Sequence, residues 1–126
     1  MEDNHAVLDN FGKGLMQYSR DRSLGLASKI LQGKMKSPNQ RIVGETLQNL
    51  TPEERKAVED LAKLLFNKMF FEFEQFLNAH PEYKLVYSDG ESEVDLLELS
   101  DGLFGEMFGD DGCIEKYSEF DGKDYF

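Results

Sequence analysis

The sequence predicts a mainly helical α+β domain, in which a bundle of helices surrounds one long central helix and a C-terminal β-hairpin with short helices completes the fold. Apolar residues recur at helical spacing as far as about residue 80, and the spacing becomes alternating after Pro81. With 126 residues, of which 40% are hydrophobic, the chain has the size of one compact domain. We therefore expect a single domain over residues 1–126, with a helical part at 1–80 and an acidic hairpin and short-helix part at 81–126.

The first helical pattern runs from Ala6 to Leu31. It predicts either two helices or one broken helix. The expected break lies at residues 18–23, because Ser19, Asp21 and Ser23 can bond nearby backbone groups and cap a new helix.

Two glycines inside this pattern, Gly12 and Gly14, each cost a helix about 1 kcal/mol relative to alanine. We expect them to mark a close crossing by a neighbouring helix. Further along, Ser37 as N-cap and Pro38 in the first turn predict a short helix over residues 38–48.

The strongest local signal is a capping box at the start of the central helix. Thr51 is the expected N-cap, Pro52 occupies the first helical position, and Glu54 can bond back to the Thr51 amide. The helix is expected to end near Asn78, before Pro81. Its apolar residues spread over more than one stripe, so neighbours should cover it from several sides. Its phenylalanines are expected in the core, with one left over for a partner or a dimer contact: Phe66, Phe70, Phe71, Phe73 and Phe76.

After Pro81, residues 84–87 and 93–96 flank a turn-rich loop at 88–92, which predicts a β-hairpin. A hairpin alone is only marginally stable in water, so we expect it to pack on the helices.

The remaining C-terminal residues predict short helices. Ser100 and Asp101 can cap a helix over residues 102–108, and residues 113–120 can form a last turn or two. Residues 121–126 are expected to fray.

Acidic residues are concentrated at the C-terminal end. Residues 85–126 hold thirteen acidic residues and two lysines, and the net charge is +2 over residues 1–50 but −13 over residues 51–126. This distribution argues against nucleic acid and favours a basic protein partner. An alternative is that the acid serves only solubility. The residues expected to bear the binding charge are Asp89, Glu91, Glu93, Asp95, Glu98, Asp101, Glu106, Asp110 and Asp111.

Several classes of protein are disfavoured. The most apolar window, residues 64–77, is interrupted by charged and amide side chains, so no membrane span is expected. The single cysteine, Cys113, cannot form an internal disulfide, and the N-terminal residues do not resemble a signal peptide, which favours the cytoplasm. No calcium-loop spacing is present, and one cysteine with two histidines falls short of a structural zinc site, so no metal or cofactor is expected.

Catalytic groups are equally sparse. Cys113 lies among carboxylates, which disfavour a thiolate, and His80 is expected to bond a carbonyl at a helix end or to face solvent. A carboxylate pair such as Glu72 and Glu74 can perform acid–base chemistry, but so acidic a chain contains such pairs by chance. We expect a non-enzymatic protein, either a monomer or a homodimer. The alternatives are a small carboxylate-based or metal-assisted enzyme and a self-associating structural protein.

One stretch resembles a known group of proteins. Residues 99–106 (LSDGLFGE), followed by DGCI at 111–114 and Tyr117-Ser118, resemble the C-terminal signature of small uncharacterised bacterial proteins related to the immunity proteins of polymorphic toxin systems. The resemblance extends weakly to Arg20-Asp21 and to residues 50–54. It implies a cytosolic protein that neutralises a toxin by binding it, and it implies no catalytic residues.

Overall fold

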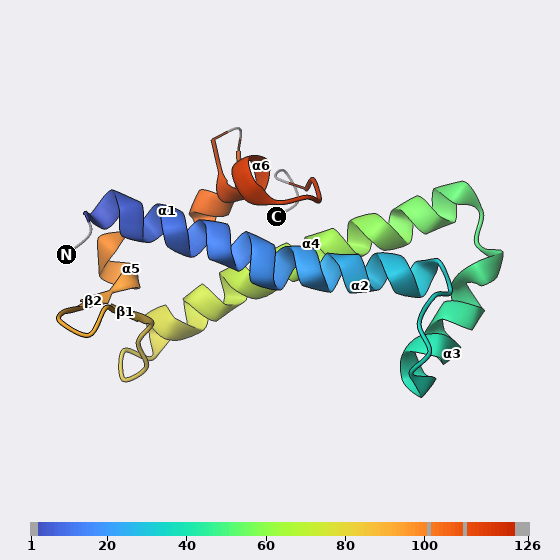
Figure 1. Ribbon diagram of the computed structural model, residues 1–126, viewed down its shortest axis with the longest axis horizontal. Helices are drawn as coiled ribbons and strands as arrows, with labels where there is room; N and C mark the ends of the chain where they lie inside the picture. The colour runs from blue at the N-terminus through green and yellow to red at the C-terminus, as the bar shows by residue number, and fades with distance from the viewer. Residues whose placement is uncertain (1–2, 101, 110, 123–126) are drawn as a thin grey trace.

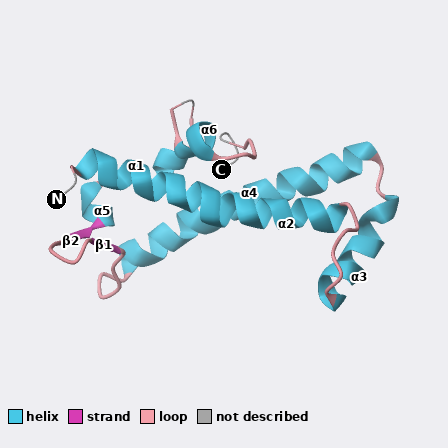
Figure 2. Cartoon of the chain, viewed as in Figure 1, coloured by secondary structure: helices cyan, strands magenta, loops and turns pink. Residues whose placement is uncertain are grey.

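Two long helical segments cross each other and form the frame of the molecule (Figure 1). The computed structural model describes residues 3–100, 102–109 and 111–122. The first segment joins α1 (Asn4–Leu15), the π-helical turn η1 (Met16–Arg20) and α2 (Asp21–Leu31), and the second is α4 (Pro52–Ala79). The described chain is mainly helical with a single two-stranded hairpin (Figure 2), which confirms the α+β, mainly α, class.

The expected break between the first two helices is absent. Residues 15, 16, 20 and 21 all keep right-handed helical backbone angles, and the Asp21 amide donates to the carbonyl of Met16, five residues back. A π turn therefore replaces the break. The Asp21 carboxylate does not cap a new helix start, because it accepts hydrogen bonds from the Ser118 hydroxyl and the Glu119 amide.

The connection from α2 to the central helix follows the sequence closely. Gly33 has a positive φ of 70° just after α2, and α3 (Pro38–Thr46) begins with Ser37 in an extended conformation. The short 3-10 turn η2 (Leu47–Asn49) then leads to α4. The predicted helix at 38–48 is thus present as α3 and the start of η2.

The capping box at the start of α4 is present as predicted. The Glu54 amide donates to Thr51 Oγ1 at 3.1 Å, and the Thr51 amide donates to Glu54 Oε1 at 2.9 Å. The helix ends at Ala79, where His80 Nδ1 lies 3.1 Å from the carbonyl oxygen of Phe76.

The prediction that neighbours cover α4 from several sides was wrong. Its fully buried side chains are Asn67, Glu74 and Leu77, whereas much of its apolar surface faces outward. Phe70 is partly buried against the core, but Phe73 and Phe76 are 46% and 44% exposed. The C-terminal segments bond Asn67 and Glu74 on one side of α4, whereas Leu61, Leu65 and Met69 are exposed.

The C-terminal part begins with the predicted hairpin, β1 (Val86–Ser88) paired antiparallel with β2 (Glu93–Asp95). Tyr87 pairs with Val94, and both are half-buried. A short helix that the sequence pattern did not indicate, α5 (Leu96–Leu99), follows directly.

The predicted helix over 102–108 is instead a turn followed by the 3-10 turn η3 (Gly105–Met107). The last helix, α6 (Cys113–Tyr117), lies within the predicted range. Asp121 and Gly122 are not frayed, since their carbonyls accept hydrogen bonds from Arg20 and Asn67; residues 123–126 lie outside the described residues.

The main core lies where the C-terminal elements fill the angle between α1 and α4. Phe104 is its centre, with ring centroids 5.5 Å from Phe70 and 6.3 Å from Phe11. The Phe104 amide donates to the buried carboxylate of Glu74 at 2.9 Å, so a polar contact also fixes this residue on α4. The buried members of the cluster are Val7, Met16, Leu96, Leu103, Phe104, Met107 and Ile114.

A buried arginine joins the C-terminal segment to both long helices. Arg20 on η1 is 0% exposed, and its Nε donates to Asn67 Oδ1 on α4 at 3.0 Å. Its guanidinium also donates to the Ser118 hydroxyl and to the carbonyls of Phe120 and Asp121. Burial lowers the pKa of Arg20 from its ordinary value, and the nearby carboxylates of Asp21 and Asp121 oppose that shift.

The capping box gives a first prediction. Thr51→Ala removes the acceptor of the Glu54 amide and should lower the free energy of unfolding by about 1 kcal/mol. The matched control is Ser37→Ala, since Ser37 is an N-cap whose side chain makes no cap hydrogen bond. Urea unfolding of both variants checks this. Equal losses for the two would show that the Thr51 hydroxyl adds nothing.

The second prediction concerns Arg20. Arg20→Met leaves a buried amide oxygen and two carbonyls without their donor, so the free energy of unfolding should fall by about 3–5 kcal/mol. Arg22→Met, at an exposed arginine two residues along, should change it by no more than about 0.5 kcal/mol. Thermal and urea unfolding measure the difference. A loss at Arg20 no greater than that at Arg22 would contradict the role of this network.

Candidate functional site

The predicted acidic residues start at a hairpin loop that the chain itself holds in shape. Asp89 Oδ1 accepts hydrogen bonds from the amides of Glu91 and Ser92, each at 2.9 Å. These bonds favour the charged carboxylate and lower the pKa of Asp89 below its ordinary value. Gly90 supplies the positive φ, 89°, that the turn requires. The loop thus presents a fixed negative charge at the tip of the hairpin.

The other predicted partner-binding residues differ in exposure. Four of them are exposed: Glu91, Glu93, Glu98 and Asp111. Asp95 is half-buried and caps α5, because its Oδ1 accepts from the Leu97 amide at 3.0 Å.

Three of the predicted residues cannot be placed on this surface. Asp101 and Asp110 lie outside the described residues, as does the side chain of Glu106. We call the exposed group Asp89, Glu91, Glu93, Glu98 and Asp111 the acidic surface.

No ion pair between described residues involves the acidic surface. The four pairs that the described part of the chain contains lie on α3 and α4 or join α4 to Asp121. Among the described residues, no lysine or arginine therefore pairs with the carboxylates of the acidic surface.

The opposite end of the molecule is weakly basic. Residues 22–44, which form most of α2 and α3, carry five Lys or Arg and no Asp or Glu, whereas the adjoining residues 45–60 carry five Asp or Glu and two Lys or Arg. The net charge over residues 22–60 is therefore +2. Figure 1 shows α3 at the end of the molecule far from the hairpin. The charge is thus separated along the long axis, and we call residues 22–44 the basic end.

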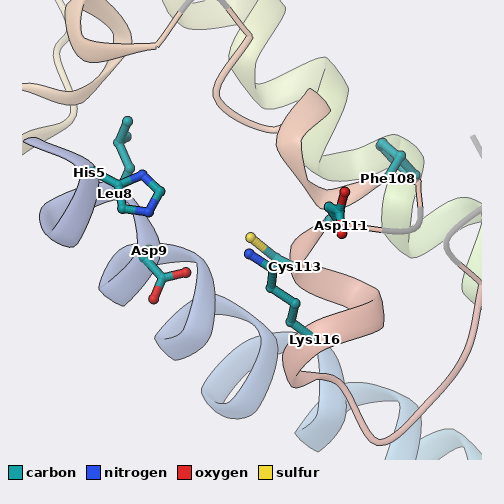
Figure 3. Close-up of a pocket in the computed structure, with 8 residues that line it drawn as sticks. His5, Leu8, Asp9, Phe108, Asp111, Cys113 and Lys116 are labelled. Atoms are coloured by element: carbon teal, nitrogen blue, oxygen red, sulfur yellow. The ribbon is translucent and has the colours of Figure 1, made fainter.

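An open pocket of about 360 Å³ lies between α1 and the C-terminal elements. Figure 3 shows Cys113 and Lys116 projecting from α6 toward α1, which supplies His5 and Asp9. Asp111 of the acidic surface also lines this pocket. The thiol, amine, imidazole and carboxylate groups of these residues are of the types that serve as nucleophiles or as general acids and bases in enzymes.

Two of the pocket residues, Asp9 and Cys113, make contacts that stabilise the fold. Both oxygens of Asp9 lie 2.7 Å from the Tyr117 hydroxyl, which donates to them, and this bond raises the pKa of Tyr117. The Cys113 side chain packs on α1 at Gly12, where an added Cβ would lie 2.3 Å from Sγ. The expected close crossing is therefore confirmed at Gly12, whereas Gly14 has nothing within 4 Å of an added Cβ.

The structure does not bring together the carboxylates considered for acid–base catalysis, nor does it form a metal site among the described residues. Glu74 is buried and bonded to the Phe104 amide, whereas Glu72 is exposed and paired with Lys68 at 2.9 Å, so the two do not form an acid–base pair. Among the described residues, no group of three or more His, Cys, Asp or Glu side chains is placed to hold a metal ion.

Sequence reasoning missed the buried polar side chains of Arg20, Asn67 and Glu74. A signal for Arg20 was present, because it interrupts a run of small or apolar residues spaced four apart at 12, 16 and 24.

Comparisons of the chain with known protein families, with curated proteins and with solved structures found no match. In the described part of the chain, no helix has the length and apolar character needed to cross a membrane.

The packing of Cys113 on Gly12 gives the third prediction. Gly12→Ala should destabilise the protein although alanine favours helix, because its methyl group would overlap Sγ. Gly14→Ala has free space and should raise the free energy of unfolding by up to about 1 kcal/mol. Adding Cys113→Ala to Gly12→Ala should recover stability, as a double-mutant cycle measures. Identical effects at the two glycines would contradict the close contact.

Proposed function

We propose that this protein is a non-enzymatic binding module whose acidic surface covers a basic surface of another protein. A toxin that acts through such a surface is the partner that best fits, and the chain would then serve as its immunity protein in the cytoplasm. The observation that carries the proposal is the group of exposed carboxylates, from the hairpin to Asp111, that form no ion pair with another described residue.

The charges are presented by a framework that resists rearrangement. The Asp89 loop holds its own turn, Tyr87 packs against the core, and Glu74 and Arg20 fasten the C-terminal segments to the helices. A surface that is already ordered loses little conformational entropy when it binds.

Electrostatics suggests how such a surface works. A concentrated field of one sign accelerates encounter with a partner of opposite sign, and pairing of the carboxylates with lysine or arginine then fixes the orientation. Occlusion of the partner's basic surface follows from contact alone and requires no chemistry.

The enzyme alternative has weaker support. The pocket at Cys113 is open, and one of its two carboxylates, Asp9, accepts a hydrogen bond from the Tyr117 hydroxyl. A binding role makes use of the charge separation, which this pocket does not explain.

The test is capture of partners on the immobilised chain from the lysate of its source organism, followed by binding kinetics at low and high salt. The variant Glu91→Lys/Glu93→Lys reverses two charges of the acidic surface and should slow association by about tenfold or more at low salt, with a smaller change in dissociation. The matched control, Glu45→Lys/Glu53→Lys, changes the net charge equally but near the basic end.

Support would be a basic partner whose association slows with salt and with the hairpin reversal but not with the control. A captured partner whose association rate ignores both salt and the reversal would overturn the proposal, and the acid would then serve solubility.

A further inference from the structure

The outer side of α4 carries an exposed apolar stripe, formed by Leu61, Leu65, Met69, Phe73 and Phe76. Phe73 lies at its edge and also contacts Phe104 of the core, with ring centroids 6.2 Å apart. These residues recur every three or four positions and so share one side of the helix. Leu65 and Met69 are 56% and 71% exposed. The buried polar residues Asn67 and Glu74, two turns apart, lie on the opposite side.

The stripe is long, and its C-terminal half is already ordered. From Leu61 to Phe76 it spans about 22 Å of helix. Phe76 stacks on Phe73 with ring centroids 6.5 Å apart and on His80 at 4.8 Å, and Tyr83 continues the series. Contiguous exposed apolar surfaces of this kind mark interaction sites. Lys68 and Glu72 pair with each other, so they add no net charge to α4.

The distribution of charge indicates which molecule covers the stripe. The basic end precedes α4 and the hairpin follows it, so these two segments lie at opposite ends of the helix (Figure 1). The net charge is +2 over residues 22–60, which include the acidic first turns of α4, and −5 over residues 82–98. A second copy laid antiparallel along the stripe places its basic end beside the hairpin of the first copy, and the reverse. A parallel copy would place like charges together at both ends.

We propose that two copies of this chain associate through the α4 stripe in an antiparallel, two-fold symmetric dimer. The apolar residues supply the contact, and two identical pairings of the basic end with the acidic surface set the direction. A two-fold arrangement uses the same surface on both copies and closes on itself, so it gives a dimer and not a filament. The inference does not rest on the proposed function, since it concerns the chain alone.

The first experiment measures the mass of the pure chain by sedimentation velocity over a range of concentrations. The parent should be dimeric, and Leu65→Gln/Met69→Gln should raise the dimer dissociation constant by about a hundredfold, because each substitution acts twice in the interface. Both positions are exposed and glutamine favours helix, so the fold should persist, as circular dichroism verifies. The control is Tyr18→Gln, at a residue 73% exposed on the other long helix, which should leave the dissociation constant unchanged.

The second experiment tests whether the two copies lie antiparallel. Lys34→Glu/Lys36→Glu and Glu91→Lys/Glu93→Lys should each weaken the dimer at low salt, and an equimolar mixture of the two variants should restore it. Added salt should weaken the parent dimer.

A parent that stays monomeric at the highest concentration reached would overturn the inference, as would a dimer that survives the double glutamine variant. A dimer that tightens as salt is added would overturn the antiparallel direction.

Discussion

The guanidinium of Arg20 is the contact on which the arrangement of the whole chain depends. It lies at the crossing of the two long helices and binds one atom of α4, one hydroxyl and two carbonyls of the C-terminal segment. A buried charge without partners is strongly unfavourable, so these groups must remain together for the fold to persist. The C-terminal part, which carries most of the acid, is thereby fixed relative to the helices.

The same buried polar contacts decide which side of α4 is covered. Asn67 donates to the carbonyl of Gly122 and Glu74 accepts from Phe104, so both draw the C-terminal segments to one side of the helix. On the other side, Leu61, Leu65 and Met69 stay exposed among the described residues. The apolar stripe is therefore a direct consequence of where the polar residues point, and the two proposed surfaces have one structural origin.

Local signals predicted the elements, and non-local contacts account for what they missed. The capping box at Thr51 and the hairpin depend on residues a few positions apart, and both are present. Arg20 and Ser118 are 98 residues apart, and no local pattern joins them. The spacing of apolar and small residues is consistent with the π turn. In a regular α-helix, Gly12 and Leu24 would point about 120° apart around the helix axis. A π turn accommodates one extra residue, which reduces this angle to about 20° and places both on one face. The candidate charges were readable from composition, whereas the cap at Asp95 and the pocket at Cys113 required coordinates.

The two proposals also constrain each other. Both use the hairpin carboxylates, and the basic end of a second copy is itself a basic protein surface. A partner must therefore compete with self-association, and it can do so only if it offers more positive charge or better fit than residues 22–44 provide. The proposed dimer contact is largely apolar and would hold two copies along α4, whereas the acidic surface extends from the hairpin to Asp111 beside α6. A partner that engages the α6 side first can add its charge there while the hairpin is still covered, so displacement of the second copy can proceed stepwise and does not require prior dissociation.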